Sequence, residues 1–110
     1  MRAIVKVLAV LAWTVLLPSL AYAQAAISGT VKDTSGAIMP GVTVEAASPV
    51  LIEKVRTAVT DGNGRYQIVD LRPGAYTVTF TLTGFNTVRR DGITLAGSTT
   101  SVVDVELRVG

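Results

Sequence analysis

The sequence predicts an all-β protein, a small antiparallel Greek-key sandwich of seven strands, within a range of six to eight, that follows an N-terminal export segment. Apolar and polar residues alternate with a period of two through most of residues 24–110. Turn residues interrupt this alternation at short intervals, and no segment after residue 23 carries a helical stripe. A single sheet would leave one apolar face wet, whereas two sheets packed face to face bury both inner faces.

The first segment of the chain is typical of a helical signal peptide. Two basic residues precede the eleven-residue apolar run Val7–Leu17, and the small-residue motif Ala21-Tyr22-Ala23 follows. A membrane anchor is the alternative, but a spanning helix needs about 20 apolar residues. We therefore expect residues 1–23 to be a signal peptide cut before Gln24, and residues 24–110 to form one exported domain without a membrane span.

The charge balance excludes two classes of partner. The chain has 10 Lys and Arg against 8 Asp and Glu, and removing Arg2 and Lys6 of the leader leaves eight of each. A neutral domain of this kind is not expected to bind nucleic acid or an anionic membrane surface. The one adjacent basic pair, Arg89-Arg90, is followed by Asp91 and is interpreted as a solvated hairpin end.

Six alternating segments are the expected strands. Their alternating sets are Ile27, Gly29 and Val31; Val42, Val44 and Ala46; Val55, Thr57 and Val59; Tyr66 and Ile68; Tyr76, Val78, Phe80 and Leu82; and Val103, Val105, Leu107 and Val109. The expected core is Tyr66, Ile68, Leu71, Tyr76, Val78 and Phe80, joined by Ile27, Val31, Val42, Val44, Val105 and Leu107. The chain has no cysteine, so core packing and sheet pairing must stabilise it without disulfides.

The stretch TDGNGRYQIVDLRPGAYTVTF, residues 60–80, holds the clearest turn signals. Asp61 can accept backbone hydrogen bonds, and the following Gly62-Asn63-Gly64 tolerates positive φ, which predicts a hairpin turn. Pro73-Gly74 predicts the next corner. Calcium at Asp61 and Asn63 is the competing interpretation, but that ion takes six to eight oxygen ligands and this turn supplies two side chains. The structural turn is therefore favoured.

The motif D-x-x-G-x-Y-x-I-x-x-L-x-P-G-x-Y-x-V-x-F, followed by Gly84-Phe85, resembles the carboxypeptidase regulatory-like domain. The upstream pattern over residues 27–44 resembles the first half of that family, so the resemblance runs from Ile27 to Leu107. It implies a prealbumin-like, seven-stranded sandwich, grouped with carbohydrate-binding-like folds. Such domains are accessory and occur beside metallocarboxypeptidases, in surface proteins and at the N-terminus of TonB-dependent outer-membrane receptors. A signal peptide followed directly by this domain is most similar to the last arrangement.

The sequence shows no recognisable catalytic or metal-binding site. The chain has no histidine and no cysteine, and its acidic residues are scattered over turns and outward strand positions. We therefore expect no enzyme, and we name no catalytic, cofactor-binding or metal-binding residue. The expected function is that of a non-catalytic accessory module in the periplasm or outer membrane of a Gram-negative bacterium, with a protein partner or the rest of a longer receptor chain as its contact. The alternatives are a carbohydrate-binding module, for which Phe85 is the candidate ring, and, more remotely, a hydrolase-associated regulatory domain.

Overall fold

The structure is a computed structural model that describes residues 24–110, and the leader expected at residues 1–23 lies outside the described residues. The described part consists of eight strands and contains no helix. The strands are β1 (Ala25–Asp33), β2 (Thr43–Ala47), β3 (Val55–Val59), β4 (Arg65–Leu71), β5 (Gly74–Thr81), β6 (Val88–Leu95), β7 (Thr100–Val102) and β8 (Val105–Leu107). The expected all-β class is confirmed.

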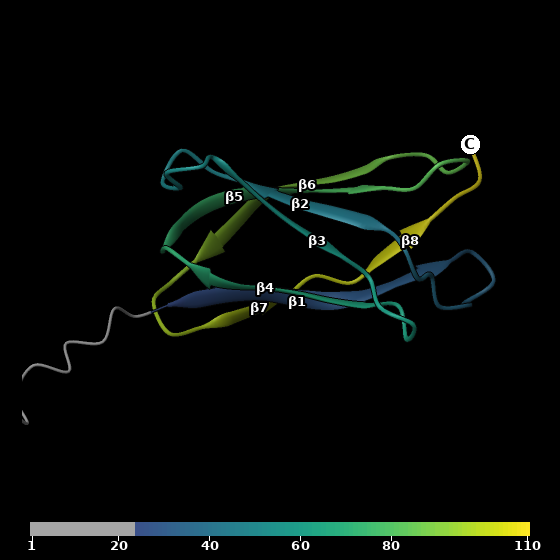
Figure 1. Ribbon diagram of the computed structural model, residues 1–110, viewed down its shortest axis with the longest axis horizontal. Helices are drawn as coiled ribbons and strands as arrows, with labels where there is room; N and C mark the ends of the chain where they lie inside the picture. The colour runs from purple at the N-terminus through teal and green to yellow at the C-terminus, as the bar shows by residue number, and fades with distance from the viewer. Residues whose placement is uncertain (1–23) are drawn as a thin grey trace, which may run out of the picture.

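The strands form two sheets that pack face to face (Figure 1). One has the order β4-β1-β7, with β8 also paired to β1, and the other has the order β3-β2-β5-β6. Four of the six pairings are antiparallel as expected, but β1 pairs in parallel with β7 and β8. After β6 the chain crosses to the side of β1 that β4 leaves open. β7 begins beside the start of β1, where Thr100 lies opposite Ala26. From there both strands run in the same direction, so their pairing is parallel.

The core lies between the sheets, and all twelve expected core residues are buried. The ring of Phe80 is fully buried and meets the ring of Tyr66 edge to face, with centroids 5.5 Å apart at 74°. Every buried polar side-chain atom in the described residues has a hydrogen-bond partner. No buried polar side-chain atom of the described residues therefore weakens the core by lacking a hydrogen bond.

The strands differ from the expectation in three places. Val55 and Val59 of β3 point outward and are 42% and 58% exposed, while Ala58 packs against the core. Arg89 and Arg90 lie inside β6, as its second and third residues, and not in the turn that precedes it; their side chains are in solvent as expected. The last predicted strand breaks at Val103 into β7 and β8, and Val109, which lies beyond β8, is 76% exposed.

Candidate interaction edge

The Asp61 turn is built from backbone hydrogen bonds. Its Oδ1 accepts hydrogen bonds from the backbone N–H groups of Asn63 at 2.9 Å and Arg65 at 3.0 Å. The Asp61 carbonyl accepts a third, from Gly64, which sits at φ 71°. The expectation that Asp61 accepts the backbone hydrogen bonds of this turn is confirmed. The expectation of a hairpin is wrong, because the turn links β3 to β4, which do not pair and belong to different sheets. Asp33 closes the β1–β2 connection in the same way, accepting from Ser35 and Ala37.

Three hydrogen-bonded carboxylates, those of Asp33, Asp61 and Asp91, predict that the protein loses stability in acid. Hydrogen bonds lower the pKa of Asp33 (chiefly from the Ser35 hydroxyl), of Asp61 (chiefly from the Arg65 backbone) and of Asp91 (chiefly from the Arg89 side chain). Because the folded pKa lies below the unfolded one, their contribution is present above the unfolded pKa of about 3.9 and is lost as pH falls through the folded values. Urea unfolding from pH 7 to pH 2 should show stability falling below about pH 4. Asp61→Asn should make that fall shallower, and an unchanged slope would contradict the assignment.

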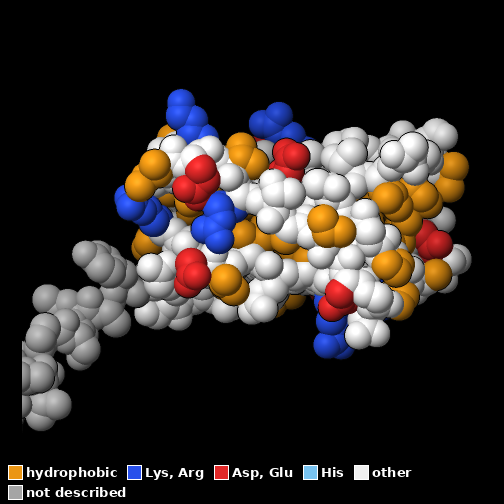
Figure 2. Space-filling model, in the orientation of Figure 1, with side chains coloured by type: hydrophobic (Ala, Val, Ile, Leu, Met, Phe, Trp, Pro, Cys, Tyr) orange, Lys and Arg blue, Asp and Glu red, His pale blue; other side chains and the backbone are white. Residues whose placement is uncertain are grey.

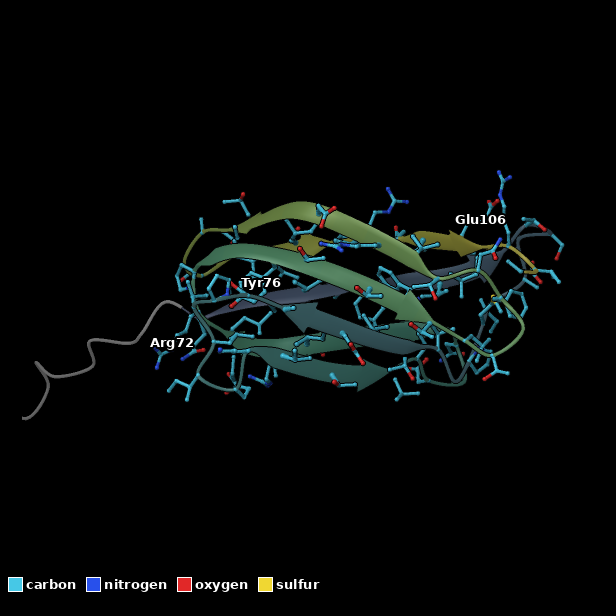
Figure 3. The ribbon with its side chains drawn as sticks, turned by 90° about the horizontal axis from the view of Figure 1, so that it is seen from above. Arg72, Tyr76 and Glu106 are labelled. Atoms are coloured by element: carbon cyan, nitrogen blue, oxygen red, sulfur yellow. The ribbon has the colours of Figure 1, made fainter. Side chains whose placement is uncertain are left out.

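The aromatic residues offer little surface for stacking a sugar ring. Tyr66, Tyr76 and Phe80 are buried, and Phe85 is half-buried against the core. The hydroxyl of Tyr76 donates to the Arg72 carbonyl at 2.7 Å, across the Pro73-Gly74 corner. Figure 3 shows this pair at one end of the sandwich and Glu106 at the other. Among residues 24–110, no aromatic ring is exposed.

The break between β7 and β8 places backbone inside the sandwich. The Val103 carbonyl lies over Gly29 of β1, and it accepts a hydrogen bond from the buried Tyr66 hydroxyl at 2.6 Å. The Val103 N–H donates to the Ser28 carbonyl, and the side chain of Asp104 accepts from the Thr30 N–H at 2.8 Å. The Val103 backbone groups and the Tyr66 hydroxyl are thus satisfied within the chain, which indicates that the crossing serves structure.

One hollow on the surface is lined by side chains of both charges and shows no catalytic arrangement. It has a volume of about 820 Å³ and is lined by Lys32, Arg65, Arg90, Asp104 and Glu106, among others. A second hollow of about 630 Å³ shares Thr30, Arg65 and Asp104 with it. In the part of the chain that the structure describes, no three acidic, histidine or cysteine side chains lie close enough together to hold a metal ion.

The edges of the two sheets differ in how they are protected from pairing with another strand. On β6 the register shifts around Gly92 at φ 72°, which is a bulge, and Arg89 pairs with Asp91 at 2.9 Å. On β4 the register also shifts, Asp70 takes φ 58°, and Arg56 of β3 donates to the Val69 carbonyl at 3.1 Å. β7 has three residues. Bulges, charges and short length are the usual means of blocking an edge strand.

β3 has no bulge on its free edge, and its one charged residue, Arg56, takes an inward position and bonds to β4. Its five residues contain no glycine or proline, and they pair with β2 in an unbroken register. The strand order places β3 at the end of its sheet, and Figure 1 shows it crossing obliquely between the layers. Hydrophobic side chains on this face are dispersed among polar ones, and charged side chains gather toward the left end (Figure 2). A regular, mostly uncharged edge strand is a site for strand addition.

The hydrogen bonds that flank β3 show which backbone groups face this edge. The Lys54 carbonyl accepts from Ser48, and the Thr60 N–H donates to Val42. Because bonded pairs alternate with non-bonded pairs in an antiparallel ladder, the even-numbered residues between them bond to β2. The N–H and C=O groups of Val55, Thr57 and Val59 therefore point to the free edge, beside outward side chains that are exposed.

The match to a known family covers nearly all of this fold. The profile of the carboxypeptidase regulatory-like domain matches residues 26–108. The chain belongs to the carboxypeptidase regulatory-like domain family. The resemblance found in the sequence from Ile27 to Leu107 is thereby confirmed.

One relative is a transporter, and the solved structures that resemble the chain are diverse. The chain is 42% identical over 91 residues to the TonB-dependent transporter Oar of Myxococcus xanthus, which covers 81% of the chain and 8% of that protein. A type II cohesin–X-dockerin complex from Acetivibrio cellulolyticus matches with a TM-score of 0.62 at 22% identity, covering 78% of this chain and 58% of that one. Catechol 1,2-dioxygenase of Acinetobacter radioresistens matches with a TM-score of 0.61 at 17% identity, covering 86% and 54%. At these identities, the two structures show a shared fold alone.

Proposed function

We propose that this chain is a non-catalytic accessory module of an exported TonB-dependent receptor system, and that its free β3 edge pairs with protein. The observation that carries the proposal is the 42% identity to a TonB-dependent transporter in a family of regulatory-like β-domains. The chain spans only 8% of that relative, which supports a module that acts as part of, or beside, a larger receptor. Among residues 24–110, no helix is long and apolar enough to cross a membrane.

The described residues also favour a role without chemistry. The acidic side chains that have shifted pKa values serve turns or pair with Arg89, and the buried hydroxyl of Tyr66 is held by a backbone carbonyl. Purified protein should therefore unfold at the same urea concentration with and without EDTA, and it should not turn over ester, glycoside or peptide substrates. Turnover that follows the protein through purification would overturn the proposal.

Export is tested by the N-terminus of the protein in the cell. Expressed in a Gram-negative host, the chain should appear in the envelope fraction with Gln24 as its first residue, because the apolar run and the Ala21-Tyr22-Ala23 motif favour cleavage there. Intact mass analysis of the fractionated protein reads this directly. An intact Met1 in the cytoplasmic fraction would contradict export.

Carbohydrate binding is the rival function, and the same purified protein can be used to test it. A glycan array probed with wild-type protein and with Phe85→Ala should show no specific binding to either, because the Phe85 ring packs against the core. Specific glycan binding that Phe85→Ala abolishes, while the variant remains folded by circular dichroism, would replace the protein-pairing proposal with a sugar-binding one.

A further inference from the structure

The outer residues of β3 form a palindrome. The strand reads V-R-T-A-V, so valines stand two positions on either side of Thr57. If two such strands pair antiparallel about a two-fold axis at Thr57, Val55 faces Val59 of the second copy and Thr57 faces Thr57. Directly opposed β-branched residues are favourable cross-strand pairs.

We propose that β3 pairs with β3 of a second copy of this chain, with Thr57 on the two-fold axis, which joins the two four-stranded sheets into one of eight strands. This inference rests on the proposed use of β3 as a pairing edge, and it names the partner. An isologous contact of this kind closes on itself, so it produces a dimer and not a fibre.

The backbone supports the same register. Val55, Thr57 and Val59 direct their N–H and C=O groups to the free edge, as the bonds of Lys54 and Thr60 require. In the register centred on Thr57, each of these three residues lies opposite one of the same three in the second copy. Three hydrogen-bonded pairs therefore form, and all the outward N–H and C=O groups of β3 are used. A shift of two residues leaves one residue of each strand without a partner.

Charge is compatible with this pairing. On the inward face of β3, Arg56 lies opposite Ala58 of the second copy, so no two like charges are directly opposed along the strand. The guanidinium of Arg56 keeps its hydrogen bond to Val69 of β4. On β6, in contrast, Arg89 and Arg90 are adjacent and the strand is bulged, which disfavours a regular self-pairing.

The expected dimer is weak. Stable specific interfaces bury about 1,200 Å² or more, and two five-residue strands lie below that size. We expect dissociation on the order of 0.1–1 mM, which sedimentation equilibrium of the purified protein from 10 µM to about 1 mM measures.

Charge reversal at the axis tests the register. Thr57→Lys and Thr57→Glu should each weaken dimerisation at least about fivefold, because each places like charges opposite one another. Mixed in equal amounts, the two variants should pair at least as tightly as the wild type. Gln67→Lys, on the exposed outer face of β4, should leave the dissociation constant unchanged. Circular dichroism melts confirm that each variant is folded.

Cysteine crosslinking gives a second measurement, because the chain has no cysteine of its own. Bonded residues in an antiparallel pair lie about 5.5 Å apart at Cα, within disulfide range. Thr57→Cys should therefore oxidise to a disulfide dimer faster than Gln67→Cys. A wild type that stays monomeric at 1 mM, a mixture that does not restore pairing, or equal crosslinking rates would overturn the self-pairing. None of these results would affect the accessory-module proposal, which turnover or cytoplasmic retention would overturn.

Discussion

Gly29→Ala is expected to destabilise the protein by about 3 kcal/mol or more, at the upper end of what overpacking a core costs. A Cβ at this position would lie 2.0 Å from the Val103 carbonyl oxygen and 2.7 Å from the carbonyl carbon. Both are backbone atoms, so no side-chain rotation relieves the contact. Moving Val103 away would break its hydrogen bonds to Tyr66 and Ser28.

The loss is large for a domain of this size. The 87 residues from 24 to 110 imply a total stability of roughly 4–13 kcal/mol. A loss of 3 kcal/mol would lower the melting temperature by roughly 12–24 °C. Thermal unfolding followed by circular dichroism measures this.

Gly62→Ala is the matched control. Gly62 lies in the Asp61 turn and does not take positive φ, and no atom lies within 4 Å of the place that an alanine Cβ would occupy there. Its substitution should leave the melting temperature within a few degrees of the wild type. Equal melting temperatures for the two alanine variants would show that the β7–β8 crossing moves aside without cost.

Local patterns in the sequence predicted the core and the turns because both depend on neighbouring residues. Burial follows a period of two along each inner strand, so Tyr76, Val78 and Phe80 could be placed on one face. The Asp61 turn could be recognised from its carboxylate and glycines alone. These features need no knowledge of which strands are neighbours.

The β7–β8 crossing and the free edge could not be predicted, because they depend on strand order. The alternation from Val103 to Val109 looks continuous, and only the glycine at an inward position of β1 signals a close backbone approach. On β3 the valines suggested an inward face. In the structure, the inward positions of this edge strand hold Arg56 and Ala58, and Arg56 reaches the carbonyls of β4. Only the order of the strands shows that β3 is the end strand of its sheet, where an inward position can hold a charged side chain.

Phe80→Ala is the second large effect, and it tests the register of β5. The Phe80 ring is fully buried opposite Val44 and packs edge to face on Tyr66. Removing it leaves a cavity and is expected to cost about 3–5 kcal/mol, against a total of roughly 4–13 kcal/mol.

The neighbouring residue provides the contrast. Thr79 lies on the outer face of the same strand, opposite Glu45 and Arg89, so Thr79→Ala should cost well under about 1 kcal/mol. Urea unfolding of the wild type and both variants gives the two differences. A slip of one residue in β5 would exchange the two faces, so equal losses, or a larger loss for Thr79→Ala, would place Phe80 outside the core. The same slip would turn Val78 and Tyr76 outward, and the buried contact between Phe80 and Tyr66 on which the two sheets meet would not form.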